Sequence, residues 1–307
     1  MIHSLLEQGI DVLLGPIGTS PVLASLSVTT PARMIQAGGA TAEEVADGVK
    51  YPYNYQFSYN SSHQARVTVE FITTKLSGKK IGVLQETFAQ SEAIANSTIA
   101  GLKDHQIAPV GYEVFPTNAL DAKSYLRNLQ RAGAEVLVLS TSLPSSTLLV
   151  FNGLRGLGWY PEIIGYTGFF SDSLLDILPP EAMSKVYIAY LRNFSYAAGG
   201  APPERQVQYV KKLLGYAETK GQEPNAASWA FYDAMHAFKW AIEKANGTDP
   251  EKLKSVLDSM TDFPGMLGKM SFTAANHSAL GPDALVMCKF DSARAPQALG
   301  AFRERVG

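Results

Sequence analysis

The sequence has 307 residues, of which 46% are apolar, and its formal net charge is −2. This length and apolar content allow a large core and favour two domains. The near-neutral charge argues against a nucleic-acid-binding protein, because such proteins usually have an excess of basic residues. The single cysteine, Cys288, excludes an intrachain disulfide and a cysteine-based metal cage, and its position after an apolar run predicts a buried, unreactive thiol.

The first fifty residues alternate between short apolar runs and helix-like segments. Residues 3–9 are typical of the end of a helix, with Gly9 as its C-cap. They contain neither the basic region nor the long apolar region of a signal peptide. The segments that follow are predicted as strand, helix, strand and short helix, at 12–14, 21–28, 33–36 and 42–47.

Two loops in this part of the chain end in small or hydroxyl-bearing residues directly before a helix. Gly15–Ser20 follows the first strand, and Gln36–Thr41 follows the second. Such loops direct N–H groups and hydroxyls at one point near the positive end of a helix dipole, and neighbouring loops share a crevice in an open α/β sheet. We therefore predict half of a carboxylate-binding site, formed by Thr19, Ser20, Gly39, Ala40 and Thr41. The alternative is that the hydroxyls are only helix N-caps, which occur in any α/β protein.

The middle of the chain repeats the strand and helix pattern more regularly. An aromatic, extended segment at 51–58 and a helix at 62–76 precede it. The predicted strands are 80–84, 110–115, 136–139, 163–165 and 186–190. The predicted helices between them are 92–106, 122–131, one that carries Leu148 and Leu154, and 171–178. The fully apolar run at 136–139 is typical of a buried parallel strand.

The last third of the chain is mainly helical. Helices are predicted at 203–220, 226–246 and 250–260, and a closing hairpin is predicted from strands at 269–272 and 284–290. The alternation of strand and helix throughout predicts an α/β, doubly wound architecture with largely parallel sheets. Breaks in the series near 58 and 189 predict two lobes: lobe I comprises 1–57 and 190–268, and lobe II comprises 58–189 and 269–307.

No pattern of residues predicts a catalytic centre, a cofactor site or a metal site. Gly153–Gly158 resembles a phosphate-binding loop, but it follows a helix rather than a strand, which favours a helix C-terminus. The five histidines are scattered without metal-ligand spacing, and no stretch approaches the roughly 18 apolar residues of a membrane span. The loops that begin at Ser140 and Tyr166 also lie at strand ends and are rich in hydroxyls, which fits ligand binding better than bond-making.

Five short segments carry a family resemblance. They are Gly9–Pro16, Gly38–Thr41, Lys79–Leu84, Ala132–Leu139 and Leu154–Gly158. In this order and spacing they are similar to segments of the type I periplasmic solute-binding proteins of ABC transporters, in the leucine/isoleucine/valine-binding branch. The resemblance covers most of the chain. It implies a two-lobed fold whose lobes are joined by a multi-strand hinge.

The resemblance also implies a function. It implies a periplasmic, monomeric protein that is not an enzyme, holds no cofactor, and delivers a small carboxylate-bearing ligand to the membrane permease of an ABC importer. In this family the first lobe holds the ligand carboxylate, here through Thr19 or Ser20 with the loop at Gly39–Thr41, and the second lobe closes over it by a hinge motion. The second-lobe contacts would come from Ser140, Ser142, Tyr166, Thr167 and Phe169.

The sequence departs from the family pattern within the implied site. Thr167 stands where amino-acid-binding members carry an acidic residue that pairs with the ligand ammonium. Because a buried, unpaired ammonium is costly, Thr167 favours a carboxylate without an amine, such as an aromatic or short aliphatic acid. Glu86 or Asp172 could supply the missing charge instead, which keeps an amino-acid ligand open. Gln90-Ser91 replaces a Tyr-Gly pair of the family and changes the pocket.

A second departure concerns the start of the chain. Compared with the family, the part before Gly9 lacks roughly two βα units, on the order of 60 residues. A sheet without its central first strand is expected to expose an apolar edge and to favour aggregation.

Two other classes of function stay open at this stage. A ligand-sensing regulator of the same fold would act without a transporter, and the absence of a signal peptide favours it. An enzyme on a doubly wound fold is disfavoured because neither paired acid and base groups nor a cofactor loop is evident.

Overall fold

The computed structural model describes residues 2–166, 174–215, 226–294 and 300–307. The chain divides into two compact units, each built from segments that are distant in the sequence. Unit 1 comprises Met1–His63 and Pro224–Ala284, and unit 2 comprises Gln64–Glu223 and Leu285–Gly307. The chain therefore passes between the units after residues 63, 223 and 284.

These crossings differ from the predicted ones, which follow residues 57, 189 and 268. Residues 269–284 group with unit 1, where the ring of His277 stacks on Tyr55 with ring centroids 4.1 Å apart. The segment after 189 groups with unit 2, where β9 (Ser195–Tyr196) pairs with β13 (Arg303–Glu304). Both contacts join segments far apart in the sequence, and a local break in the strand and helix series does not reveal them.

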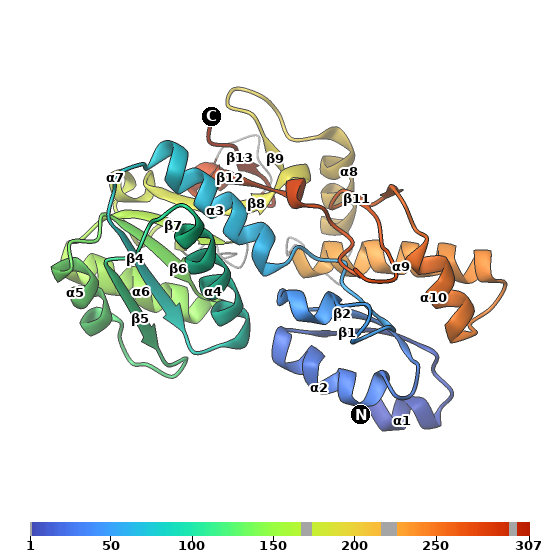
Figure 1. Cartoon of the computed structure of the whole chain (residues 1–307). Coiled ribbons are helices and arrows are strands. Elements are labelled where there is room, and N and C mark those ends of the chain that lie inside the picture. Colours follow the sequence, from blue (N-terminus) through green and yellow to red (C-terminus); the bar gives the residue numbers. More distant parts are fainter. Residues whose placement is uncertain (1, 167–173, 216–225, 295–299) are drawn as a thin grey trace. The chain divides into compact units, whose positions relative to one another are not determined.

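Unit 1 is built around a parallel sheet of three strands in the order β1-β2-β3. The strands are β1 (Val12–Ile17), β2 (Ile35–Gly39) and β3 (Asn54–Tyr55). Helices α1 (Ile2–Glu7) and α2 (Thr19–Thr29) lie on one side of it, and α9 (Ala226–Ala245) and α10 (Pro250–Asp258) lie on the other (Figure 1). Strand β1 is an edge of this sheet in the described part of the chain, and Leu14 and Ile17 on it are exposed.

Glycine allows α2 to lie directly on the unit 1 sheet. A Cβ atom at Gly38 would lie 2.9 Å from Cγ1 of Val22 on α2 and 2.8 Å from Oδ1 of Asn54 on β3. Real Cβ atoms do not approach other heavy atoms so closely, so a larger residue at this position would push α2 away from β2. The Gly38-Gly39 pair therefore has a packing role beside any role in the loop that follows.

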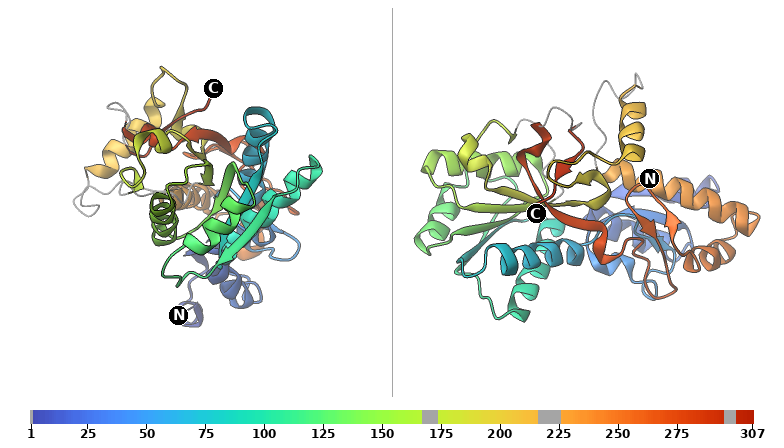
Figure 2. Two further views of the ribbon diagram at one scale, coloured as in Figure 1. Left: turned by 90° about the vertical axis from the view of Figure 1, so that its left-hand side faces the viewer. Right: turned by 90° about the horizontal axis from the view of Figure 1, so that it is seen from above.

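Unit 2 contains a six-stranded sheet in the order β12-β8-β7-β6-β4-β5. All its neighbours are parallel except the pair of β12 and β8, which is antiparallel. The strands are β4 (Ile81–Glu86), β5 (Gly111–Phe115), β6 (Val136–Ser140), β7 (Glu162–Tyr166), β8 (Val186–Leu191) and β12 (Leu285–Lys289). Helices α3 (Ser61–Lys75) and α4 (Ala89–Asp104) cover one face, and α5 (Lys123–Arg131) and α6 (Pro144–Leu157) cover the other (Figure 2).

The remaining elements are short. Unit 2 also contains α7 (Pro180–Met183) and α8 (Glu204–Leu214), and unit 1 contains the β10 (Phe263–Pro264) and β11 (Lys269–Met270) pair. Single 3-10 turns occur at Glu43–Ala46, Arg192–Phe194, Pro282–Ala284 and Asp291–Arg294. No helix within the described ranges is both long and apolar enough to cross a membrane.

The predicted α/β architecture is confirmed, but one predicted pairing is wrong. The strands at 269–272 and 284–290 do not form a hairpin with each other. Lys269–Met270 pairs with Phe263–Pro264, and β12 pairs with β8 of the large sheet. The turn between β10 and β11 is held by Asp233, whose carboxylate accepts the N–H groups of Met266 and Leu267 at 2.7 and 3.0 Å. This contact comes from α9, more than thirty residues earlier, and has no local sequence signal.

Two predictions about single segments can also be compared with the structure. Cys288 is fully buried in β12, as predicted, and burial raises the pKa of its thiol to about 12. Of the helix predicted at 171–178, the first three residues lie outside the described residues. Residues 174–178 form turns that lead to Pro179, and α7 begins after it.

Candidate functional site

The two N-terminal loops of unit 1 meet where β1 and β2 end. Gly18 follows β1 with a φ of +99°, a left-handed value that suits glycine, and α2 begins at Thr19. The Gly18 N–H donates to the carbonyl of Gly39 at 2.8 Å, which joins the two loops. The predicted residues Thr19, Gly39, Ala40 and Thr41 therefore lie on adjoining loops at one end of the sheet.

Two polar side chains and one N–H group fix the second loop through its carbonyl groups. Gln56 Nε2 donates to the carbonyls of Ala40 and Ala42 at 2.9 and 3.2 Å, and Ser58 Oγ donates to that of Ala40 at 2.9 Å. The Ser61 N–H donates to the carbonyl of Thr41 at 2.7 Å. The N–H groups of Ala40 and Thr41 donate to no acceptor in the part of the chain that the structure describes.

The hydroxyls of Thr19 and Thr41 are also without partners. Their residues are only 2% and 5% exposed, and neither Oγ1 atom has a hydrogen-bond partner among the described residues. Leaving a buried hydroxyl unsatisfied costs about 1–3 kcal/mol. A carboxylate oxygen would accept from such hydroxyls and from free N–H groups, and the N-terminus of α2 favours a negative charge.

Two other predicted residues differ from Thr19 and Thr41 in their surroundings. Ser20 lies exposed in the first turn of α2. Gly39 is half-buried, and a Cβ atom there would lie 3.1 Å from the Phe231 ring on α9. Gly39 thus allows a close approach of α9 to the loop.

Three predicted residues of unit 2, Ser140, Ser142 and Tyr166, belong to one hydrogen-bonded cluster at the ends of β4, β6 and β7. Tyr166 OH donates to Ser142 Oγ at 2.7 Å, Ser142 Oγ lies 2.6 Å from Ser91 Oγ, and Ser91 Oγ donates to Glu86 Oε1 at 2.9 Å. Because each hydroxyl has one hydrogen, these contacts run in one direction, from Tyr166 to the Glu86 carboxylate. Ser140 donates to the Ser91 carbonyl at 2.6 Å and is fully buried.

From the sequence, Glu86 is only an alternative source of negative charge and Ser91 only part of a pair that changes the pocket, and neither is among the predicted ligand contacts. Glu86 is the last residue of β4, so a carboxylate at a strand end is the signal that could have found it. Ser91 is one of the two residues that replace the Tyr-Gly pair of the family, and it now supports Glu86 and Ser140. The predicted contacts Thr167 and Phe169, and Asp172, lie outside the described residues.

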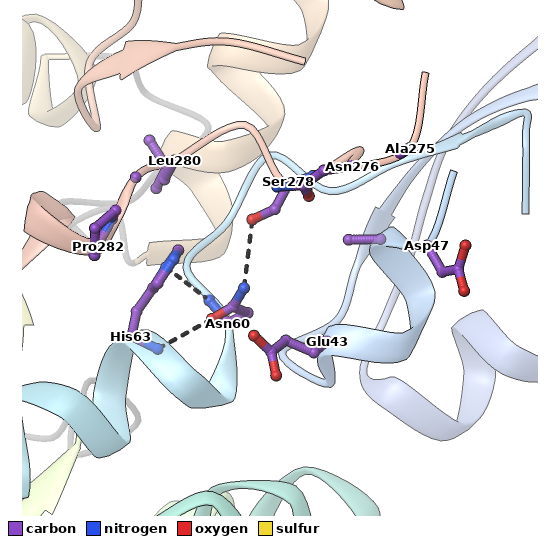
Figure 3. A pocket seen from close by; sticks show the side chains of 11 residues that line it. Glu43, Asp47, Asn60, His63, Ala275, Asn276, Ser278, Leu280 and Pro282 are labelled. Atoms are coloured by element: carbon purple, nitrogen blue, oxygen red, sulfur yellow. Dashed lines mark hydrogen bonds between the residues drawn. The ribbon is translucent and has the colours of Figure 1, made fainter. Parts of the chain in front are cut away.

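Unit 1 also contains a cavity of about 490 Å³ that is separate from the hydroxyl pair (Figure 3). Asn60 links its walls: the Asn60 amide lies 3.5 Å from Ser278 Oγ, and its Oδ1 accepts the His63 N–H at 3.0 Å. Two carboxylates, Glu43 and Asp47, also line the cavity, so its charge disfavours an anionic ligand. Among the described residues, no group of three His, Cys, Asp or Glu side chains could hold a metal ion.

The chain is thus a two-unit α/β protein with two polar clusters at strand ends. A family model described as "Periplasmic binding protein" matches residues 2–294. The chain therefore belongs to the periplasmic binding protein family, whose description names a binding protein and not an enzyme. The predicted family and its two-lobed fold are confirmed.

Individual relatives agree with this assignment. A protein described as Leu/Ile/Val-binding protein homolog 1, from Brucella abortus (strain 2308), is 22% identical over 253 residues, which cover 80% of this chain and 65% of that protein. The chain thus spans less than two thirds of the length of this curated relative.

Solved structures show the same fold. A type 1 periplasmic binding protein from Bordetella pertussis Tohama I is similar with a TM-score of 0.83 at 17% identity, over 99% of this chain and 83% of that one. An ABC transporter substrate-binding protein from Desulfitobacterium hafniense, solved in complex with leucine, is similar with a TM-score of 0.70 at 17% identity, over 92% and 78% of the two chains.

Proposed function

We propose that this chain is the solute-binding component of an ABC importer and that it binds a small organic carboxylate. The observation that carries the proposal is the pair of buried, unpartnered hydroxyls of Thr19 and Thr41, which lie on adjoining loops. The N–H groups of Ala40 and Thr41 add two donors on the same loop. Four donors near a helix N-terminus suit a carboxylate better than a cation or an apolar group.

The cluster in unit 2 is a second group of polar residues that we propose for ligand contact. Its members lie at the carboxyl ends of β4, β6 and β7, where open α/β sheets usually bind their ligands. The names of relatives as Leu/Ile/Val-binding proteins and the leucine complex of a structural neighbour support a small carboxylate of this kind. A periplasmic location and a membrane permease as partner belong to the same proposal.

Substitution of the two threonines tests the carboxylate site. Thr19→Val and Thr41→Val each remove a hydroxyl while keeping the shape of the side chain. A hydrogen bond to a charged group contributes about 1.5–3 kcal/mol, so each variant should bind a carboxylate ligand about tenfold more weakly or worse. Isothermal titration calorimetry would measure this with the carboxylate that stabilises the wild-type chain most strongly.

Thr30→Val is the matched control. Thr30 also has a buried Oγ1 without a partner among the described residues, but it lies at the opposite end of α2. Its substitution should leave the affinity unchanged. Equal affinities of the wild-type, Thr19→Val and Thr41→Val chains would contradict the proposed site.

A further inference from the structure

Arg303 is a buried arginine of unit 2 that lies near the C-terminus. The residue is 3% exposed, and it belongs to β13, which runs beside β9 (Figure 1). The ion pairs within the described part of the chain do not include it. A guanidinium group stays charged at physiological pH, and a buried charge is normally paired. Arg303 is therefore a buried positive charge to which the described residues offer no carboxylate.

The hydrogen bonds of Arg303 leave one edge of its guanidinium group unused. Nη1 donates to the carbonyls of Gly300 and Phe302, to the second at 2.9 Å. Nε is buried without a hydrogen-bond partner among the described residues, and none of their acceptors receives a hydrogen bond from Nη2. Nε and Nη2 form the edge whose two parallel N–H bonds match two oxygens of an oxyanion. The unused edge is thus the one that suits bidentate binding.

Two aromatic rings fix the place of this guanidinium group. Its Cζ atom lies 5.4 Å from the centre of the Tyr190 ring and 6.0 Å from the centre of the Phe290 ring. Tyr190 is itself fixed, because its OH donates to the carbonyl of Ala301 at 2.7 Å. Ring faces attract a cation but carry no net charge. The rings therefore orient the guanidinium group of Arg303 without neutralising it.

The carboxylate that is nearest to Arg303 in the sequence has another partner. Glu304 Oε1 accepts from Lys289 Nζ at 3.0 Å. In the pairing of β13 with β9, Arg303 lies opposite Ser195 and Glu304 lies opposite Tyr196. Successive residues of a strand point to opposite faces, so Glu304 points away from Arg303. Its carboxylate therefore does not compensate the charge of Arg303.

Neighbouring arginines add to the positive charge. Arg305 donates from Nε to Ser195 Oγ at 2.8 Å and from Nη2 to two backbone carbonyls, and it forms no ion pair with a described residue. Burial raises the pKa of the Cys288 thiol to about 12. The charges of Arg305, Arg303 and Arg192 act against this shift, so all three lie near one buried position. Such a concentration of positive charge favours an anion.

We propose that the Nε–Nη2 edge of Arg303 binds a small inorganic oxyanion such as phosphate or sulfate. The site lies wholly within unit 2, and the inference does not rest on the carboxylate site proposed for unit 1. The bound oxyanion supplies the negative charge that the described residues around Arg303 lack. It thereby stabilises the pairing of β13 with β9 near the C-terminus. A buried water molecule, which accepts a hydrogen bond but brings no charge, is the competing occupant.

A thermal-shift titration of the whole chain tests the proposal. The chain is dialysed into a sodium chloride buffer, and sodium phosphate or sodium sulfate then replaces the chloride at constant ionic strength. A ligand that binds only the native state raises the melting temperature, so we expect a rise of about 3 °C or more that saturates as the site fills. These anions also stabilise proteins in general through exclusion from the surface, but that effect does not saturate.

The variant Arg303→Lys then tests the residue. Lysine keeps the charge but lacks the planar edge, so the apparent affinity for phosphate should fall about tenfold or more. Arg127→Lys, the same change at an exposed residue of α5, is the matched control and should titrate like the wild-type chain. The NMR signals of arginine Nε–H groups give a second readout that needs no substitution. One of these signals should shift along the same saturation curve in the wild-type chain.

The outcomes also separate this inference from the proposed function. A rise that does not saturate, or that is equal in the wild-type and Arg303→Lys chains, would overturn the oxyanion site. An arginine Nε–H spectrum that phosphate leaves unchanged would overturn it even if the Arg303→Lys chain does not fold. Thr19→Val should titrate with phosphate like the wild-type chain. Loss of the phosphate effect in that variant would place the anion in unit 1 and contradict the role of Arg303.

Discussion

At the scale of single residues, the buried polar groups of unit 1 show which side chains are already paired and which are not. His277 is fully buried, with Nδ1 2.9 Å from the carbonyl of Asn54 and Nε2 2.9 Å from Asp258 Oδ1. Both ring nitrogens therefore lie within hydrogen-bond distance of a polar group. Asp258 also accepts from Tyr55 OH at 2.8 Å and from Lys254 Nζ at 2.5 Å. This cluster is satisfied, in contrast to Thr19 and Thr41.

The Asp258 cluster predicts how stability depends on pH. Burial alone would raise the pKa of Asp258, but hydrogen bonds from His277, Lys254 and Tyr55 hold that pKa below its ordinary value. A carboxyl whose pKa is lowered by folding stabilises the native state above its unfolded pKa of about 3.9. That contribution is lost as the pH falls through the lower, folded-state pKa.

The variant Asp258→Asn should therefore be less stable than the wild-type chain at pH 7, by about 2 kcal/mol, because it removes the charged acceptor of the hydrogen bonds from His277, Lys254 and Tyr55. The difference should shrink below pH 4. Urea unfolding at several pH values measures both effects. Asp262→Asn, at an exposed residue whose ion pair with Lys269 is 3.9 Å long, should change stability little at either pH. A difference that is the same at pH 3 and pH 7 would contradict this role of the Asp258 charge.

At the scale of elements, the sequence predicts the regular parts well because their signals are local. The fully apolar run at Val136–Leu139 is a buried parallel strand, as its composition indicates, and the helix predicted at 226–246 is present as α9, with Trp229 and Phe238 buried. Pairing between elements is not local. The predicted hairpin at 269–290 is wrong because Leu285–Lys289 instead completes the edge of the large sheet beside β8.

The contact between α2 and β2 gives a prediction at this scale. Gly38→Ala would place a methyl group 2.8 Å from Asn54 Oδ1 and 2.9 Å from Val22 Cγ1, so the helix must shift. We expect a loss of about 1–3 kcal/mol in the free energy of unfolding, measured by urea denaturation. Because α2 also carries Thr19, binding of the ligand should weaken as well.

Gly281→Ala is the control for this substitution. No atom lies within 4 Å of a Cβ atom built at Gly281, and its φ is not in the left-handed range, so stability should change little. An unchanged stability of the Gly38→Ala chain would show that the two elements are not packed as closely as the structure describes.

At the scale of the whole molecule, the sequence predicts the α/β architecture and two units but places all three crossings differently. A local break in the alternation of strands and helices marks only a change in secondary structure. The unit to which a segment belongs depends instead on contacts between residues far apart in the sequence, such as the stacking of His277 on Tyr55. The same limit applies to the site. Strand-end loops with hydroxyls predict Thr19, Thr41 and Ser142, but the place of Glu86 in the unit 2 cluster becomes evident only when the three donors to its carboxylate are placed around it.

The central claim is that unit 1 binds the negatively charged carboxylate of a ligand. A thermal-shift comparison of free acids with their primary amides tests this claim directly. Each pair, such as L-leucine and L-leucinamide, differs only in the carboxylate. At 100 times its Kd, a ligand stabilises the native state by about 2.7 kcal/mol, which raises the melting temperature measurably. The account predicts that at least one free acid raises it and that its amide does not. Equal shifts by acid and amide, or no shift by any acid, would contradict a carboxylate site at Thr19 and Thr41.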